Sequence, residues 1–240
     1  MSRWHAQQWT IVEAVERPSA AAVAALAEFP TTQIADCGGP VGVVGPGLGR
    51  LAGGTEFCGP AVTVWTKPGD ILFLLKMPEL TRPGDVVAVD GGGRADAAVL
   101  GDILTGAVAR RGVVGIVVDG AVRDLEGIDE LGVPTFARNA YPATGSNEGP
   151  GAINVPVQIG GVAVRPGDVV RGDASGVVVV PREHLDTVLA LTRDVAQREA
   201  AWRQAMADGA TMAAATGVDA LLEERRSAAA APAAARRDLG

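Results

Sequence analysis

The chain has 240 residues, of which 48% are hydrophobic and 4% aromatic, and its 32 glycines favour an α/β protein with a core of small aliphatic side chains. Its formal charge is −7 without any run of Lys or Arg, which argues against a nucleic-acid partner. We find neither the apolar core of a signal peptide nor a run of ~18 apolar residues, so we expect no membrane partner and a cytoplasmic location.

Two short helices are expected first. Residues 19–29 predict one helix, which Ser19 caps and Pro30 ends. The next segment, TTQIADCGG from residue 31, predicts a second helix that stops at its two glycines. Asp36 lies in the last turn of that helix, where a carboxylate faces an unfavourable helix dipole. This suggests a functional role, although a solvent-exposed Asp is the simpler interpretation.

Strands are expected at 59–66 and 86–90, because both segments are rich in β-branched residues. Pro-Gly-Asp occurs three times, at 68–70, 83–85 and 166–168. We interpret each occurrence as a turn that leads into a strand, and their irregular spacing excludes a repeat architecture.

The central stretch, residues 90–124, predicts one α/β crossover. Three glycines at 91–93 follow the strand, a helix covers 95–110 or begins only at Gly101-Asp102, and a strand covers 113–120. The glycines do not match a dinucleotide-binding fingerprint, although they are compatible with a close approach to a small ligand. Because open α/β sheets bind ligands at strand C-termini, we expect the site here.

The C-terminal part predicts a half-turn of helix and a strand over 128–138, then three or four short strands over 147–181. Residues 182–226 are expected to be helical almost throughout. We therefore divide the chain into an α/β domain (1–181), a helical extension that packs on a neighbouring subunit (182–226) and an Ala-rich tail (227–240).

Two dipeptides in the crossover carry the candidate chemistry. If a helix opens at Gly101-Asp102, the backbone N–H groups of Ile103 and Leu104 form an anion site, whereas the simpler interpretation makes Asp102 an N-cap. Arg123-Asp124 offers a guanidinium for a carboxylate and a hard oxygen ligand for Mg²⁺ or Mn²⁺, and the alternative is a surface ion pair. Taken together, the two dipeptides favour a site.

Other reactive side chains lie apart from this stretch. Cys37 and Cys58 have no companions at metal-ligand spacing, so we predict buried free thiols. His5 and His184 are distant from the motif, and for His184 we favour a capping or surface role.

The pattern of Asp102 followed by Arg123-Asp124 resembles the metal and substrate motif of the RraA-like superfamily (regulator of ribonuclease activity A), in particular its class II pyruvate aldolases. The resemblance extends through TTQIADCGG, GPAVTV, LGDILTGAVARRGVVGIVVDGAVRD and PGDVVRGDASGVVVVP. It implies an α/β sandwich of the swivelling β/β/α kind with a long C-terminal helical extension. It also implies a homotrimer or hexamer with sites at subunit interfaces.

Residue roles follow from the resemblance alone. Asp124 would bind the divalent metal and Asp102 would support it. Arg123 and the amides of the turn from Gly101 to Leu104 would bind the pyruvoyl group. Glu199, from the C-terminal helix of a neighbouring subunit, would complete the metal shell, and Asp36 would face the leaving half of the substrate.

The implied activity is divalent-metal-dependent cleavage of a 4-hydroxy-2-oxoacid of the 4-hydroxy-4-methyl-2-oxoglutarate type to pyruvate, with oxaloacetate decarboxylation through the same metal-stabilised enolate. An imine mechanism is not favoured, because Lys67 and Lys76 are the chain's only lysines and both precede the site. One alternative is a non-catalytic regulator like the superfamily's namesake, against which the long helix bearing Glu199 argues. A methyltransferase is disfavoured, because no glycine-rich S-adenosylmethionine loop is found.

Overall fold

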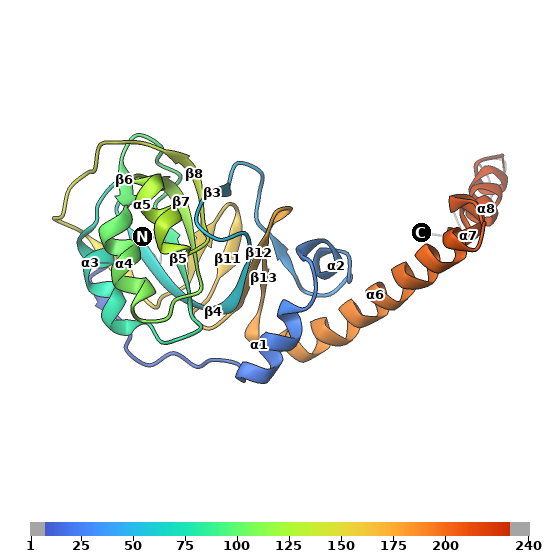
Figure 1. The fold of residues 1–240 in the computed structure, drawn as a ribbon, viewed down its shortest axis with the longest axis horizontal. Coiled ribbons are helices and arrows are strands. Elements are labelled where there is room, and N and C mark those ends of the chain that lie inside the picture. Colours follow the sequence, from blue (N-terminus) through green and yellow to red (C-terminus); the bar gives the residue numbers. More distant parts are fainter. Residues whose placement is uncertain (1–7, 231–240) are drawn as a thin grey trace. The chain divides into compact units, whose positions relative to one another are not determined.

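The protein is described by a computed structural model that covers residues 8–230 (Figure 1). Its main sheet has the strand order β2-β13-β12-β4-β5-β7-β8-β3, with β1, β6 and β9 paired beside this path and β10-β11 forming a separate hairpin. The strands are β1 Thr10–Ile11, β2 Gly42–Val43, β3 Gly49–Ala52, β4 Phe57–Thr66, β5 Val86–Asp90, β6 Ala98–Leu100, β7 Gly115–Val122, β8 Thr135–Ala140, β9 Gly151–Ile153, β10 Val157–Ile159, β11 Val162–Val164, β12 Val169–Asp173 and β13 Gly176–Val180. The helices are α1 Ala20–Ala27, α2 Thr31–Ala35, α3 Leu72–Lys76, α4 Asp102–Ala109, α5 Leu125–Leu131, α6 Leu185–Ala207, α7 Met212–Thr216 and α8 Val218–Ala230, with 3₁₀ turns at Met77–Leu80 and Arg182–His184.

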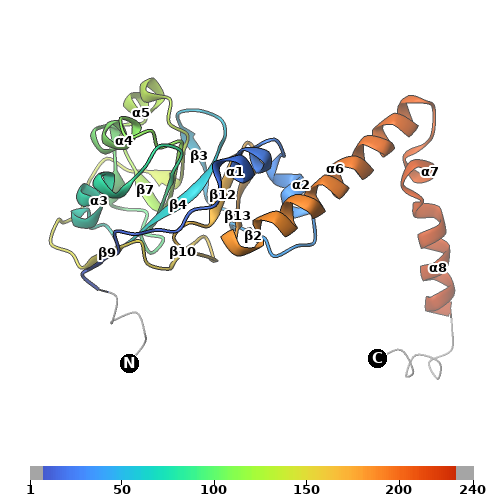
Figure 2. The same cartoon turned by 90° about the horizontal axis from the view of Figure 1, so that it is seen from below.

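Two hydrophobic cores lie on opposite faces of the central parallel strands. Along β5, Val87 and Val89 point into the core under α3, α4 and α5, whereas Val86 and Ala88 point into the core under the β10-β11 hairpin. Figure 2 shows these helices and β10 on opposite sides of β4 and β7. Both faces of β5 are covered, which explains its unbroken apolar sequence. The α/β sandwich expected from the sequence is therefore confirmed, with one helical layer and two β layers.

The central crossovers place two strand ends side by side. Strands β4, β5, β7 and β8 run parallel, and β6 also pairs with β7 in parallel. Leu100 at the end of β6 is the register partner of Val122 at the end of β7. The residues that follow these strands therefore emerge next to each other.

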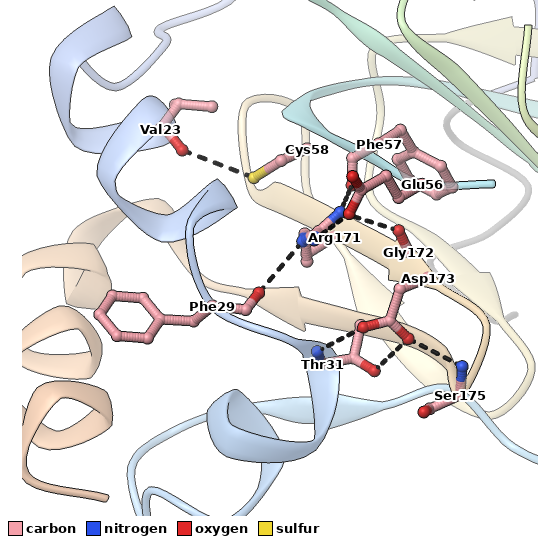
Figure 3. A network of polar contacts seen from close by, with 10 residues as sticks. All are labelled: Val23, Phe29, Thr31, Glu56, Phe57, Cys58, Arg171, Gly172, Asp173 and Ser175. Atoms are coloured by element: carbon pink, nitrogen blue, oxygen red, sulfur yellow. Dashed lines mark hydrogen bonds and ion pairs between the residues drawn. The ribbon is translucent and has the colours of Figure 1, made fainter. Parts of the chain in front are cut away.

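A network of partly buried polar contacts attaches α1 and α2 to β12 (Figure 3). The Arg171 guanidinium donates to the carbonyl of Phe29 just beyond α1, at 3.3 Å, and to Glu56 Oε2, at 2.7 Å. Two residues along the same strand, Asp173 accepts from the amide and the hydroxyl of Thr31, each at 2.7 Å. A cation thus lies at the end of one helix and an anion at the start of the next, as the helix dipoles favour.

Several expected elements differ in the structure. Residues 98–100 form β6 instead of the first turns of a helix, because they pair with β7, and the helix begins at Asp102. The region 147–181 contains five strands, not three or four, and β2 and β3 were not foreseen. The predicted half-turn near 128 is the longer helix α5.

The C-terminal helical region is interrupted after Ala207, because Gly209 adopts a positive φ of +100° and Thr211 caps a new helix. The chain divides into two compact units between Thr192 and Arg193, within α6. The last ten residues of the expected Ala-rich tail lie outside the described residues. No described helix is both long and apolar enough to cross a membrane.

Candidate active site

Gly101-Asp102 and Arg123-Asp124 meet beyond the paired ends of β6 and β7. The Arg123 amide donates to the Leu100 carbonyl at 2.9 Å, which joins the two segments directly. Both dipeptides border a cavity of about 290 Å³. The cavity-lining residues are Ile71, Leu75, Pro78, Ala98, Val99, Leu100, Gly101, Asp102, Ile103, Leu104, Ala107, Arg123, Asp124 and Thr144. Six of the eight residues that the sequence suggested as a site therefore lie around one hollow.

Two glycines make room for the two carboxylates. A Cβ atom at position 101 would lie 2.3 Å from Asp124 Oδ2, and a Cβ atom at position 127 would lie 2.7 Å from Asp102 Cβ. Asp124 thus packs against the start of α4, while Asp102 packs against the first turn of α5. This reciprocal contact explains why each helix has a glycine where it approaches the other's Asp.

Asp124 combines an unusual backbone with an accessible carboxylate. It is the N-cap residue of α5 and adopts the left-handed conformation (φ +57°, ψ +45°), which Asp and Asn tolerate better than other side chains. Its Oδ2 lies 3.3 Å from Arg123 Nε, and the exposed side-chain fractions are 44% for Asp124 and 39% for Arg123. The ion pair that the sequence left as an alternative is present, but it lies at the cavity and remains open to a ligand.

The N-terminus of α4 is only partly available for an anion. Gly101 is the N-cap residue, so Asp102 is not the cap but the first helical residue, and its Oδ1 accepts from the Ile103 amide at 2.6 Å. The expectation of two free amides is therefore wrong for Ile103. No described residue accepts from the Leu104 amide, which leaves one donor at the cavity.

The cavity offers hard oxygen ligands that suit a divalent cation. Mg²⁺ is commonly bound by one or two carboxylates together with substrate oxygens and water, and here Asp102 and Asp124 supply two carboxylates at one rim. Among the described residues no group of three or more His, Cys, Asp or Glu side chains could bind a metal ion. Asp102 and Asp124 therefore fit a Mg²⁺ or Mn²⁺ site as two of its ligands, with the other positions open to substrate oxygens and water.

Two predicted site residues do not border this cavity. Asp36 is the exposed C-cap residue of α2, which packs on β12 and β13 and not on the central crossovers. Figure 1 shows α2 well away from α4 and α5. Glu199 lies on α6 in the second compact unit, where its Oε2 accepts from Arg203 Nη2 at 2.6 Å. A role for either residue in catalysis stays a prediction.

The three glycines that follow β5 do not form a ligand site. The amides of Gly91 and Gly93 both donate to the Asp119 carbonyl, at 3.1 and 3.0 Å, and the Gly92 amide donates to Asp90 Oδ1 at 3.1 Å. Burial first, and the nearby Asp119 charge in addition, raise the pKa of Asp90 above its ordinary value, against the effect of two amide donors. The loop amides thus bind the Asp119 carbonyl and the Asp90 carboxylate, and none of the three glycines borders the cavity.

Sequence reasoning missed the part of the cavity wall that comes from α3 and from residues 141–149. Ile71, Leu75 and Pro78 line the cavity from one segment and Thr144 from the other. Asp70, just before α3, accepts four hydrogen bonds, three of them from residues 146–149. Burial opposes its charge, but these donors together lower the pKa of Asp70. The sequence feature that could have pointed to this wall is the Pro-Gly-Asp turn at 68–70, which lies just before α3.

The remaining reactive side chains lie elsewhere in the structure. Cys37 and Cys58 are free thiols; Cys37 is buried as predicted, whereas Cys58 is only partly buried. Desolvation raises the pKa of Cys58 to about 12, despite the nearby Arg171, so it is not a nucleophile at neutral pH. His184 lies exposed in the 3₁₀ turn before α6, and His5 is outside the described residues. Lys76 is the last residue of α3 and pairs with Glu79.

Comparison with known proteins shows the family of this chain. Residues 11–179 match the family model RraA-like, described as Aldolase/RraA. A Halalkalibacterium halodurans protein provisionally named 4-hydroxy-4-methyl-2-oxoglutarate aldolase is 36% identical over 180 residues, which is 75% of this chain and 86% of that protein.

Two solved structures have the same fold. A Pseudomonas syringae protein described as uncharacterized aligns with a TM-score of 0.72 at 28% identity, over 84% of this chain and 99% of its own. A Streptomyces coelicolor protein, described as an unusual member of the RNase ES inhibitor RraA family, aligns with a TM-score of 0.68 at 34% identity, over 77% of this chain and 96% of its own.

Proposed function

The chain belongs to the Aldolase/RraA family, and we propose that it is a divalent-metal-dependent carbon–carbon lyase that releases pyruvate from 4-hydroxy-2-oxoacids. The representative substrate is 4-hydroxy-4-methyl-2-oxoglutarate, which appears in the name of the relative described above. Oxaloacetate decarboxylation is the expected companion reaction, because loss of CO₂ from oxaloacetate leaves the same pyruvate enolate.

The observation that carries the proposal is the meeting of Arg123, Asp102 and Asp124 at one cavity. A guanidinium binds a planar carboxylate through two parallel hydrogen bonds, which suits the carboxylate of a 2-oxoacid. The Leu104 amide and the positive end of the α4 dipole favour negative charge at the same place. The cavity therefore combines groups that bind an anion with groups that bind a cation.

Cleavage of the C3–C4 bond leaves a negative charge on the 2-oxo oxygen, and that charge needs a partner already in place. A cation bound by Asp124, with support from Asp102, would supply a Lewis acid for this oxygen. Arg123 would hold the neighbouring carboxylate in a fixed orientation while the charge develops. No lysine lines the cavity, so the proposed reaction involves no imine.

The assembly is part of the proposal. Asp102 and Asp124 are too few to complete a cation's ligand shell, and we assign a further ligand to Glu199 of a neighbouring copy in a homotrimer or hexamer. The exposed Asp36 would then face the leaving half of the substrate only in a site between copies.

A coupled pyruvate assay tests the proposal. Purified protein receives 4-hydroxy-4-methyl-2-oxoglutarate or oxaloacetate with Mg²⁺ or Mn²⁺, and then an excess of chelator. Pyruvate release that the metal starts and the chelator stops supports a metal-dependent lyase. Since free cations also decarboxylate oxaloacetate, the protein-dependent rate is the excess over an Asp124→Asn sample at the same metal concentration.

A second candidate is a regulator that acts by protein contact, as the description of the Streptomyces coelicolor relative suggests. It predicts no pyruvate from any of these substrates at any metal concentration. It also predicts that Arg123 and Asp124 can be replaced without loss of function. The assay therefore separates the two candidates directly.

A further inference from the structure

The three Pro-Gly-Asp turns share one backbone conformation. Their glycines, Gly69, Gly84 and Gly167, have φ values of +85°, +88° and +87°. In each turn the Asp amide donates to the carbonyl of the residue three positions earlier, at 2.8 to 3.1 Å. All three Asp residues are at most 2% exposed. Differences between them must therefore come from what their carboxylates bind.

Two of the carboxylates close their own turns. Asp85 Oδ2 accepts from the Arg82 amide at 2.7 Å, and Asp168 Oδ2 accepts from the Arg165 amide at 2.8 Å. Asp85 also pairs with Arg17 at 2.7 Å. These contacts stabilise the turns and the strands that follow them, and they lie away from the candidate active site.

Asp70 is used differently. Its Oδ1 accepts from the Leu72 amide at 2.9 Å, at the start of α3. Its Oδ2 accepts from Ser146 Oγ at 2.6 Å and from the amides of Glu148 and Gly149 at 2.8 and 2.9 Å. One buried carboxylate therefore connects α3 to a segment more than 70 positions later in the chain.

Both connected segments reach the cavity. Ile71 and Leu75 line it from α3, and Thr144 lines it from the later segment. The Ile71 amide also donates to the Ser146 carbonyl at 2.8 Å, and Thr144 Oγ1 donates to the Ala98 carbonyl at 3.1 Å. Part of the cavity wall is thus built from two segments that Asp70 fixes to each other.

We propose that Asp70 is a positioning residue, which fixes the cavity wall made by α3 and residues 144–149 for the reaction proposed above. It lines no part of the cavity itself and touches no reacting atom. Asp70 can hold the two segments together because both of its carboxylate oxygens accept hydrogen bonds. An Asn side chain in its place has only one accepting oxygen, and its NH₂ group would face at least one buried N–H donor. The inference depends on the proposed function only where it concerns turnover.

The test compares Asp70→Asn with Asp168→Asn, its matched control in an equally buried turn of the same sequence. In Asp70→Asn we expect amide hydrogen exchange at Glu148 and Gly149 to rise about tenfold or more, since two protecting contacts are lost. We also expect kcat/KM for pyruvate release to fall about tenfold, mainly through a higher KM, as loss of substrate positioning predicts. Asp168→Asn lowers Tm but leaves exchange in 144–149 and both kinetic constants within about twofold of wild type.

A milder variant keeps the test decisive if Asp70→Asn does not fold. Ser146→Ala removes a single donor and should change the same two readouts in the same direction, by a smaller factor. Wild-type exchange in 144–149 for both Asp70→Asn and Ser146→Ala would overturn the inference, as would an equal response to Asp168→Asn. If wild-type protein releases no pyruvate, the proposed function fails, while the exchange comparison still decides whether Asp70 fixes this wall.

Discussion

Two clusters of Arg and Asp side chains lie on this sheet, one within β12 and one just beyond β7, and they differ in how many hydrogen bonds their charged groups make. At β12, all three Arg171 nitrogens donate hydrogen bonds, and 5% of the side chain is exposed (Figure 3). Beyond β7, the side chains of Arg123 and Asp124 make a 3.3 Å ion pair with each other and no other polar contact among the described residues, and they are 39% and 44% exposed. The Arg171 guanidinium is thus buried among protein acceptors, whereas the Arg123 and Asp124 side chains are accessible to a ligand.

This difference separates stability from function. A buried Arg whose three nitrogens all donate hydrogen bonds is costly to remove, because its buried partners would be left without a donor. A half-exposed pair contributes little to folding, because water screens it. Changes at β12 should therefore affect unfolding, and changes at the cavity should affect turnover.

The largest expected effect is that of Asp124→Asn on activity. Asn keeps the size of the side chain and tolerates the left-handed backbone, but it removes the charge that would bind a cation. Pyruvate release should fall about 10³-fold or more, as for other groups that stabilise developing charge, whereas the free energy of unfolding changes by less than about 0.5 kcal/mol. Asp96→Asn is the control, since Asp96 also forms an exposed pair, with Arg94, but lies outside the cavity.

Arg171→Met should give the converse result. The carbonyls of Phe29, Phe57 and Gly172 lose their donor, and we expect a loss of about 3 kcal/mol in the free energy of unfolding. This corresponds to a Tm lower by roughly 6–12 °C, measured by calorimetry, with unchanged turnover per folded molecule. Arg165→Met, which removes an exposed pair with Glu183, should change Tm by about 2 °C or less. A large loss of turnover per folded molecule in Arg171→Met would contradict the assignment of a purely structural role to Arg171.

Gly101→Ala tests whether turnover depends on the close approach of the Asp124 carboxylate to the backbone of Gly101. The added Cβ would lie 2.3 Å from Asp124 Oδ2, so the carboxylate must move away from its place. We expect turnover to fall about 10- to 100-fold, since displacement by about 1 Å has that effect at an active site. Gly49→Ala should have no effect on turnover, because a Cβ at position 49 would contact nothing within 4 Å.

Asp173→Asn should show the smallest effect, and one that depends on pH. Burial opposes the charge of Asp173, but donors from Thr31 and Ser175 and the nearby Arg171 lower its pKa below 3.8. Its contribution is therefore fully present above the unfolded-state pKa and is lost as the pH falls through the lower folded-state pKa. Unfolding curves should show a deficit of about 1–2 kcal/mol at pH 7 that disappears in acid. The exposed Asp186→Asn serves as the control, with no such deficit.

The central part of the site could be predicted from the sequence because its geometry is local. A parallel crossover brings successive strand ends to one edge of a sheet, so Gly101-Asp102 and Arg123-Asp124 were expected together. The start of α4 remained ambiguous, because Ala98–Leu100 is apolar and too short for its period to distinguish a strand from a helix. Only the pairing with β7 determines that these residues form a strand.

The rest of the cavity could not be predicted, because it depends on contacts distant in the sequence. Ser146 is 76 positions from Asp70, and nothing in either segment indicates that one binds the other. The Pro-Gly-Asp motif predicts a turn at all three places, but it does not show which segment each of the three carboxylates binds, nor that Asp70 alone binds residues 146–149. The displacement of Asp36 from the cavity has the same cause, because Arg171 and Asp173 determine where α2 lies.

The most direct test of the account is the initial rate of pyruvate release from 4-hydroxy-4-methyl-2-oxoglutarate, measured with Mn²⁺ for wild type, Asp124→Asn and Arg171→Met at a temperature where all three are folded. We predict turnover by wild type and by Arg171→Met, none above background by Asp124→Asn, and loss of all turnover on adding chelator. Equal rates in wild type and Asp124→Asn, or turnover that survives the chelator, would contradict the assignment of a metal-dependent lyase site to this cavity.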